Sequence, residues 1–576
     1  MKNGTSIIQW KAMAVAGIVA SAALVGCAFG GETLYNGIVL PDKWPPAIDP
    51  KDESPVRIPY LERANMPAAI PIDVGRQLFV DDFLVESTGG VTRAFFKPVK
   101  YIENPVMWPQ TATELANAPG CCMPGGAVWW DPVRKRFRMW YLSGWSGPVS
   151  LAESEDGLRW ERPAVRPDGS NVVLPDQFAD TFSVWPDYAA ANPYANWRLC
   201  VSPGGNPTRS VEYMSPDGVN WTFAKKTGWH GDSTTLFYNP FRRKWVWSLR
   251  SNWRKRSRIY HEHSDFLAGA DWNFPLKKGA DSMKKAYYEN TAGLVANSPD
   301  CYIWLACDNA DATCTMNGTV RQSQMYNVDA TPYESVMVGL FKVICGHDND
   351  EAANAGLPKT TFCHFGYSRD GFHFSRPDRT PAISPGGWGS GAWDTGYIGF
   401  CSSGFVIKDE QLWIYYVGAR GDGTANNPPE CVITNGMHLN FSVGVAKMRR
   451  DGFAGMVADG AGEVVTRPVV FSGAHLFINA DARFGSLAAE VLDSDGEPFP
   501  GYAAADCKGL VRIDATKRGL SWKGGDLSRF AGKPVRFRFR MKVATLFSFW
   551  VSKDAAGKSG GYLAAGGPAY AGLRDE

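Results

Sequence analysis

Several signatures of common enzyme chemistry are missing from this 576-residue sequence. No two cysteines have Cys-x-x-Cys spacing, and neither His-Glu-x-x-His nor a glycine-rich phosphate-binding loop occurs. The acidic stretch "HDNDE" at 347–351 lacks the spacing of a calcium-binding loop, and we interpret it as a solvated loop. The sequence therefore predicts no metal and no cofactor, and it argues against zinc enzymes and nucleotide hydrolases.

An excess of charge of either sign is also missing. Lys and Arg total 60, against 58 Asp and Glu. Residues 1–26 contain two lysines and no acid, so basic and acidic side chains balance once this segment is removed. A neutral chain gives no electrostatic reason to expect a nucleic acid as partner.

Long apolar runs are confined to the N-terminus. Residues 1–26 combine two lysines with an Ala- and Gly-rich stretch that is short for a membrane span, which is typical of an export signal. The stretch ends in Leu-Val-Gly-Cys, which resembles a bacterial lipobox with Cys27 as the acylated residue; cleavage after Ala28 is the alternative. We therefore predict a periplasmic or cell-surface lipoprotein that meets the membrane only through this lipid anchor. Eleven cysteines follow Cys27, and their spacing defines no disulfide pattern.

Two repeated frames organise the rest of the chain. The first reads Ser-x-Asp-Gly-x-x-aromatic and occurs at 154–160, 215–221 and 368–374. Asp-Gly between two strand-like runs indicates a tight hairpin turn, and Ser and Asp side chains satisfy the amides of such turns. We interpret these residues as closing hairpins rather than taking part in chemistry.

The second frame is an apolar strand, a polar turn and a strand rich in Trp and Tyr. It occurs five times, with turns at Asp131, Asn192, Asn239, Ser298 and Asp409. In the first three units the two frames stay 25 or 26 residues apart. Each unit then supplies two hairpins, so the sequence predicts an all-β fold with a five-bladed β-propeller over 75–460.

The segments on either side of the predicted propeller differ from it in composition and in the spacing of their expected strands. Residues 27–74 are Pro-rich and read as an extended arm that lifts the globule from its anchor or wraps its surface. We expect "RQLFVDDF" at 76–83 to close the ring by pairing into the terminal blade, with Asp81 and Asp82 in turn or closure roles. Short, closely spaced strands over 464–576 predict a C-terminal β-sandwich.

A propeller followed by a sandwich in an exported protein resembles glycoside hydrolase family 32 and its relatives in families 43, 68 and 130. The stretches "LYNGIVLPDKWPP", "DPVRKRFRMWY", "SRDGFHFSRP" and "AGKPVRFRFRMKVATLFSFWVS" are similar to a bacterial family-32-like branch. The resemblance implies a glycosidase with a carbohydrate substrate. The Asn-Asp-Pro-Asn-Gly signature of family 32 is absent, and the first unit enters as "CCMPGGAVWWDP", with no acid at the point of that signature.

Acidic residues stand at the start of the expected inner strand in four of the five units. Glycosidic cleavage needs one carboxylic acid and one carboxylate, and crowding separates the pKa values of neighbouring acids. We predict Glu289 as general acid, Asp232 as base or nucleophile, and Asp180 and Asp394 as groups that stabilise the transition state or hold sugar hydroxyls. Taken singly, such an acid is more often a salt-bridged or capping residue, and it is the coincidence of four that supports the catalytic interpretation.

Four further residues are candidates for binding the substrate. Glu114 precedes the first unit, and His230 lies two residues before Asp232. Arg250 and Arg254 belong to the basic stretch "RSNWRKRSR", which we interpret as an exposed hairpin turn; the alternative is contact with a uronate, sulfate or phosphate group.

Three functions remain open. The first is an envelope-anchored glycoside hydrolase that cleaves an oligo- or polysaccharide, with a phosphorylase as a variant. The second is a glycan-binding lipoprotein without turnover. The third is a propeller polysaccharide lyase, which needs a His or Tyr base and a neutralised uronate. The geometry of the predicted acids separates the hydrolase from the binding protein. A central channel of the propeller that is basic and rich in His and Tyr would favour the lyase.

Overall fold

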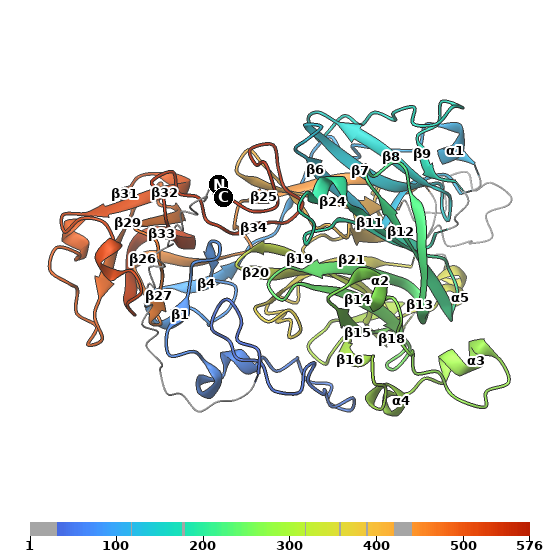
Figure 1. Ribbon diagram of the computed structural model, residues 1–576, viewed down its shortest axis with the longest axis horizontal. Coiled ribbons are helices and arrows are strands. Elements are labelled where there is room, and N and C mark those ends of the chain that lie inside the picture. The colour runs from blue at the N-terminus through green and yellow to red at the C-terminus, as the bar shows by residue number, and fades with distance from the viewer. Residues whose placement is uncertain are drawn as a thin grey trace, which may run out of the picture.

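The computed structural model describes residues 31–116, 118–175, 179–316, 318–355, 359–387, 390–419 and 440–576. Cys27 and the predicted export signal lie outside these residues. The prediction of an all-β chain is confirmed, because strands dominate and the described helices have only four to six residues (Figure 1). They are α1 (Ala112–Leu115), α2 (Phe266–Gly269), α3 (Met283–Tyr288), α4 (Ala292–Ala296) and α5 (Asn349–Asn354). Within the described ranges, no helix has the length and apolar character that crossing a membrane requires.

Between residues 121 and 449 the described strands form five successive antiparallel sheets, and the long strand β13 passes from the second sheet into the third. The first sheet contains β6 (Cys121–Asp131), β7 (Arg136–Ser143), β8 (Val149–Ser154) and β9 (Val172–Leu174). The second contains β10 (Thr181–Pro186), β11 (Trp197–Ser202), β12 (Thr208–Ser215) and the first half of β13 (Thr222–Asn239). The third contains the second half of β13 with β14 (Lys244–Ser251), β15 (Ser257–His263) and β16 (Tyr302–Leu305).

The fourth and fifth sheets each recruit a strand from a distant part of the chain. The fourth contains β19 (Gln324–Glu334), β20 (Val336–Ile344), β21 (Thr361–Ser368) and the C-terminal β34 (Tyr562–Leu563). The fifth contains β22 (Ile398–Phe400), β23 (Val406–Lys408), β24 (Gln411–Gly418), β25 (Ser442–Arg449) and the N-terminal β5 (Val99–Lys100). A hairpin of β17 (Thr313–Met316) and β18 (Thr319–Gln322) lies between the third and fourth sheets in the chain.

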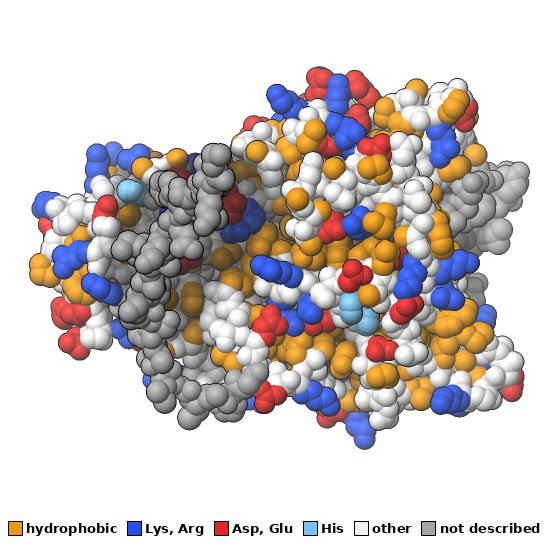
Figure 2. Space-filling model, viewed as in Figure 1, with side chains coloured by type: hydrophobic (Ala, Val, Ile, Leu, Met, Phe, Trp, Pro, Cys, Tyr) orange, Lys and Arg blue, Asp and Glu red, His pale blue; other side chains and the backbone are white. Residues whose placement is uncertain are grey.

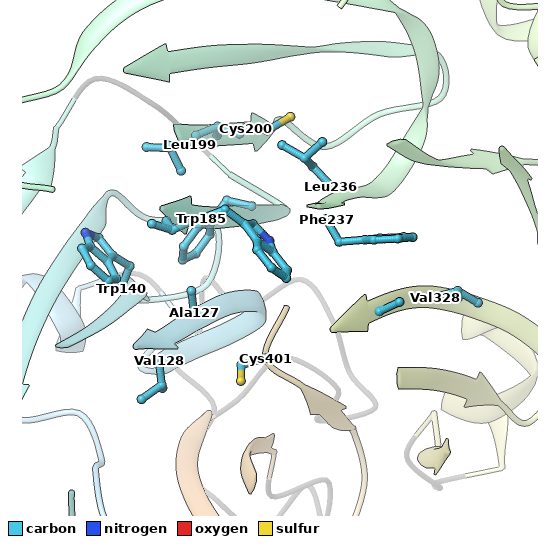
Figure 3. Close-up of a cluster of buried hydrophobic side chains, with 14 of the residues drawn as sticks. Ala127, Val128, Trp140, Trp185, Leu199, Cys200, Leu236, Phe237, Val328 and Cys401 are labelled. Carbon is cyan, nitrogen blue, oxygen red and sulfur yellow. The ribbon is translucent and has the colours of Figure 1, made fainter. Parts of the chain in front are cut away.

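The five sheets stand around a common axis, and we call this unit the ring. β6 contacts β10, β10 contacts β13, β13 contacts β19, β20 contacts β22, and β22 returns to β6. Figure 3 shows Val128, Trp185, Leu236 and Val328, from four different sheets, gathered in one buried cluster. Burial of these side chains therefore holds neighbouring sheets together.

The Ser-x-Asp-Gly frames close turns, as interpreted from the sequence. In the second sheet Ser215 Oγ accepts the amide N–H of Gly218 at 2.8 Å, and Asp217 Oδ1 accepts that of Val219 at 2.9 Å. Gly218 has φ +73°, which glycine adopts without strain. Its carbonyl accepts the indole N–H of Trp140 in the first sheet at 2.9 Å. This turn therefore also fastens one sheet to the next.

The expected fourth unit is wrong. Glu289, predicted to open an inner strand, lies at the C-terminus of α3, and the Trp- and Tyr-rich strand near 302 is β16, the outer strand of the third sheet. The true first hairpin of the fourth sheet turns at Glu334 and Ser335, with φ +51° at Glu334. This turn contains no Gly, Pro, Asn or Asp, and Ser335 is its one weak turn signal.

The expected ring closure is also wrong. β2 (Gln77–Leu78), within "RQLFVDDF", pairs with β33 (Arg536–Ser552) outside the ring. β5 instead adds to the outer edge of β25 and closes the fifth sheet. Asp81 pairs with the buried Arg369 at 2.8 Å, so its role is structural, as expected.

Strands from both ends of the chain form a second unit, which we call the C-terminal body. Its principal strands are β26 (Ala454–Thr466), β28 (His475–Asp481), β29 (Ser486–Leu492), β32 (Asp514–Trp522) and β33. The N-terminal strands β3 (Val85–Gly89) and β4 (Thr92–Phe95) pair with β26, and β1 (Ile70–Pro71) pairs with β27 (Val469–Val470). Two short strands, β30 (Cys507–Lys508) and β31 (Leu510–Val511), pair with β32 and β29.

The Pro-rich arm packs onto this body. Leu34, Ile38 and Tyr60 belong to the same buried cluster as side chains of β28 and β33. Figure 1 accordingly shows the blue N-terminal segment beside the orange and red strands. The described part of the arm therefore lies against the surface of the globule, which is the second of the two roles considered for it.

Buried charges join the ring to the C-terminal body. Arg76 donates to Asp451 at 3.0 Å, and Arg450 donates to Glu334 at 2.9 Å. All four side chains are at most 2% exposed. Ser548 and Ser559 of the C-terminal body also donate to these carboxylates, at 2.6 and 2.7 Å. Such groups tolerate burial only because each is paired.

Candidate active site

Asp180 and Asp232 meet at one end of the ring, the end at which β10, the second half of β13 and β19 begin; we call this end the mouth. Asp180 immediately precedes β10 in the second sheet. Its Oδ2 accepts the amide N–H and the hydroxyl of Ser233, both at 3.1 Å. Because Asp232 adjoins Ser233, carboxyl groups from two neighbouring sheets share one site.

A break in the ladder of β13 positions Asp232. The pairing with β14 shifts register between Gly231 and Thr235, and Ser233 has φ +52°. An extra residue at such a bulge turns its neighbours out of the regular ladder. A Cβ at Gly231 would lie 2.1 Å from the hydroxyl oxygen of Tyr287, so only glycine fits there.

Asp232 faces donors that suit a carboxylate anion. Asn206 Nδ2 donates to Asp232 Oδ2 at 2.9 Å, and Arg250 Nε lies 3.4 Å from Oδ1. Asn206 also accepts the amide N–H of Asp232 at 3.1 Å, so the side chain is held from two directions. The Asp232 side chain is 28% exposed, which leaves it within reach of a ligand.

Asp180 differs from Asp232 in its electrostatics. Burial, together with the nearby charge of Asp232, raises the pKa of Asp180 to about 6, although Ser233 and the ammonium of Lys342 act in the opposite direction. A carboxyl group with a raised pKa next to a second carboxyl group is an arrangement that acid–base catalysis uses.

A small cavity lies on the axis below the two acids. It has a volume of about 10 Å³, room for about one water molecule. Its lining includes Ser233, Asn327, Asp329 and Lys342. Burial raises the pKa of Asp329 to about 6 and lowers the pKa of Lys342 to about 8.

Two tyrosines surround the ammonium of Lys342. Its Nζ lies 4.0 Å from the ring centroid of Tyr397 and 4.9 Å from that of Tyr326. The faces of aromatic rings attract a cation. Lys342 therefore brings positive charge to the floor of the site.

Two of the four predicted catalytic acids are paired with lysines. Glu289 is a third exposed and forms an ion pair with Lys277. Asp394 is buried, lies 2.6 Å from Lys100 of the closing strand β5 and accepts the hydroxyl of Tyr416 at 3.0 Å. The alternative interpretation, that each acid is an ion-paired residue, describes both Glu289 and Asp394. Among the described residues, no hydrogen bond or ion pair joins Glu289 or Asp394 to Asp180 or Asp232, so their convergence with this pair stays a prediction.

Of the four predicted binding residues, only Arg250 contacts the pair. Glu114 is fully buried, caps α1 and pairs with Arg162 at 2.7 Å. Burial opposes ionisation of Glu114, but hydrogen bonds from Arg162 and Tyr141 outweigh it and lower its pKa.

His230 and Arg254 have structural partners. The buried His230 accepts the Ser210 amide N–H at Nε2 (2.8 Å) and donates from Nδ1 to the Gly231 carbonyl (2.6 Å); burial lowers its pKa to about 4. Arg254 donates to the carbonyls of Pro50 and Asp52, at 3.1 and 2.6 Å, and so ties the arm to the third sheet.

Among the residues of the site that the sequence did not predict are Asn206, Ser233, Asp329 and Lys342. Lys342 had a usable signal, because it is a lone charge within the apolar strand "VMVGLFKVI". Asp329 was missed because its strand was assigned to no unit. Asn206 and Ser233 resemble ordinary loop residues, and nothing local distinguishes them.

No protein-family model and no curated protein matches the chain. Among solved structures, an N-acetylgalactosamine deacetylase from F. plautii in complex with blood group B trisaccharide is 14% identical, covers 63% of this chain and 97% of its own, and has a TM-score of 0.38. A putative glycoside hydrolase from Bacteroides ovatus is 13% identical over 61% of this chain and 97% of its own, with a TM-score of 0.35.

A fructofuranosidase from Schwanniomyces occidentalis complexed with fructosylnystose is 8% identical over 77% of this chain and 98% of its own, with a TM-score of 0.32. Enzymes that act on glycans, glycoside hydrolases among them, are thus among the solved structures similar to this chain. At these identities and scores, roles for individual residues rest on the geometry above.

Proposed function

We propose that the protein is a glycoside hydrolase with Asp180 and Asp232 as its catalytic pair. The observation that carries the proposal is their meeting through Ser233, with the pKa of Asp180 raised to about 6 and Asp232 facing Arg250 and Asn206. We further propose that the ring is a five-bladed propeller, that the C-terminal body is a β-sandwich, and that the mature protein is exported and lipid-anchored through Cys27.

Asp180 and Asp232 take different roles in glycosidic cleavage. Asp180, protonated at mildly acidic pH, delivers its proton to the glycosidic oxygen as the bond to the anomeric carbon breaks. Asp232 either attacks that carbon or removes a proton from the attacking water. Hydrolysis then adds the elements of water across the bond. Glu289, which the sequence predicted as the general acid, has no part in this mechanism.

The test is turnover of an unactivated glycan by single-residue variants. A panel of plant, algal and host glycans, analysed for released products, identifies a substrate for the purified protein. Asp180→Asn and Asp232→Asn should each lower kcat/KM by about 10²–10⁴-fold, because an amide can neither deliver the proton nor act as the carboxylate. Glu289→Gln, which removes an acid that is paired with Lys277, should retain full activity. Full activity in either Asn variant contradicts the proposal.

A polysaccharide lyase is the second candidate. Tyr326 and Tyr397 stand beside Lys342, and Arg250 lies next to Asp232. Tyrosine with neighbouring cations suits proton abstraction from a uronate. Product analysis separates the two, because a lyase leaves an unsaturated sugar end and a hydrolase leaves two saturated ends. An unsaturated product that persists in Asp180→Asn and disappears in Tyr326→Phe would favour the lyase.

A further inference from the structure

A second concave site lies at the end of the ring opposite the mouth. It is a groove of about 1860 Å³ between the first turns of the sheets and the C-terminal residues 568–576. Asp180 precedes β10 and Tyr188 follows it, with Tyr188 in the groove wall. Eight residues of extended chain separate the two, so the groove lies about 25 Å from the acids.

Aromatic rings form much of the groove wall. Tyr188, Tyr238 and Tyr562 come from the second sheet, the third sheet and the C-terminal segment. The ring centroid of Tyr188 lies 5.4 Å from that of Tyr238 and 6.3 Å from that of Tyr562. Tyr188 and Tyr562 are only partly buried. Amphipathic aromatic faces in a concave surface suit the packing of sugar rings.

The groove is positively charged although the whole chain is almost neutral. Figure 2 shows both signs of charge mixed over one face of the molecule. In the groove, Glu410 pairs with Arg450 and Glu576 pairs with Arg574, at 3.2 and 2.9 Å. Four further basic side chains have no carboxylate partner among the described residues: Lys135, Arg243, Lys517 and Lys558.

Most of this charge is open to solvent. Lys135, Arg243 and Lys558 are exposed, and Lys517 donates only to the carbonyl of Ala556, at 3.1 Å. Asp575, the remaining acid of the groove, accepts the amide N–H of Ser559 at 3.0 Å. Basic side chains lining a concave surface focus positive potential there and attract anions.

We propose that this groove binds an anionic polysaccharide, with carboxylate or sulfate groups against the basic side chains and sugar rings against the tyrosines. The groove exceeds the roughly 300–1,000 Å³ of a small-molecule pocket, so a chain fills it better than a single sugar. Binding in the groove is a separate function from the proposed hydrolysis, because it needs neither Asp180 nor Asp232.

Equilibrium binding of three probes to the full chain tests the proposal. Polygalacturonate carries carboxylates, dextran sulfate carries sulfates, and dextran is neutral. We expect binding of at least one of the two polyanions, weakened by salt, and at least tenfold weaker binding of dextran. The polyanion that binds more tightly identifies the charged group that the groove recognises.

A matched pair of triple variants locates the site. Lys135→Gln, Arg243→Gln and Lys558→Gln together should lower polyanion affinity at least tenfold and flatten its salt dependence. Lys278→Gln, Lys284→Gln and Lys508→Gln remove the same charge from exposed positions outside the groove lining and should leave affinity within twofold. Asp232→Asn should bind the polyanion as the wild type does.

Three results overturn the proposal: no binding of either polyanion, equal binding of dextran, or equal loss in both triple variants. Loss of binding in Asp232→Asn places the polyanion at the mouth instead and equally contradicts the groove site. None of these results bears on hydrolysis, which the Asp180 and Asp232 variants test by turnover.

Discussion

At the scale of single residues, the site depends on opposed charges in a confined space. Asp180 lies near Asp232 and Lys342, while Arg250 pairs with Asp232. One carboxyl group can stay protonated near neutral pH because the protein surrounds it with little water and a second carboxylate. Lys342 limits that effect, since its charge favours the ionised form of Asp180.

The pH dependence of activity follows from this balance. If Asp180 must be protonated, kcat/KM should fall as pH rises through about 6, the pKa of Asp180. Lys342→Met removes a neighbouring cation, which raises the pKa of Asp180, so the alkaline limb of the kcat/KM profile should move to higher pH. Lys342→Arg keeps the charge and should restore the wild-type limb. An alkaline limb that Lys342→Met leaves in place would exclude this role for Lys342.

At the scale of elements, the turn glycines connect sheets as well as strands. Gly218 and Gly279 have nearly the same φ, +73° and +74°. A Cβ at Gly218 would lie 2.7 Å from the Trp140 ring, whereas a Cβ at Gly279 meets nothing within 4 Å. An alanine would meet the same left-handed strain at either position, whereas its packing would differ.

Alanine at these two glycines separates strain from packing. Gly279→Ala should cost about 1 kcal/mol of the free energy of unfolding, the cost of a left-handed alanine. Gly218→Ala should cost about 1–3 kcal/mol more, because the added methyl group displaces the Trp140 ring. Denaturant unfolding of both variants measures the difference. Equal losses would mean that the turn does not hold the neighbouring sheet through close packing.

The two wrong expectations about elements have a common cause. The turn at Glu334 and Ser335 is specified by ion pairs with Arg76 and Arg450, which are remote in the chain. β5 closes the ring in preference to "RQLFVDDF" because the latter's apolar residues Phe79 and Phe83 pack into the C-terminal body. In both cases partners far along the chain outweigh the local pattern.

At the scale of the whole molecule, the ring and the C-terminal body fold as interdependent parts. The chain enters through the C-terminal body, passes to the ring at β5, returns to the C-terminal body at β26 and ends against β19 of the ring. The buried network of Arg76, Glu334, Arg450 and Asp451 lies at this crossing. Loss of one member leaves an unpaired charge where water cannot reach it.

Arg450→Met tests this junction. It leaves Glu334 with fewer partners in a fully buried site, so the free energy of unfolding should fall by about 3–5 kcal/mol. Arg483→Met removes an arginine that is 59% exposed and should cost less than about 1 kcal/mol. Denaturant unfolding monitored by tryptophan fluorescence measures both. A loss below about 1 kcal/mol for Arg450→Met would show that the network is dispensable.

The sequence by itself determined the all-β class, the Ser-x-Asp-Gly turns and the place of Asp180 and Asp232 at neighbouring strands of the ring. These features depend on contacts within a few residues, namely alternating strands, a glycine with positive φ, and side chains that cap the turn amides.

Only the tertiary structure decided which acids share a site. Glu289 and Asp394 look like Asp180 and Asp232 in the sequence, but a lysine neutralises each of them. The groove opposite the mouth likewise exists only because residues more than 400 positions apart, such as Lys135 and Lys558, line the same surface. Charge pairing and surface shape depend on long-range proximity, and a repeat pattern read along the chain does not contain that information.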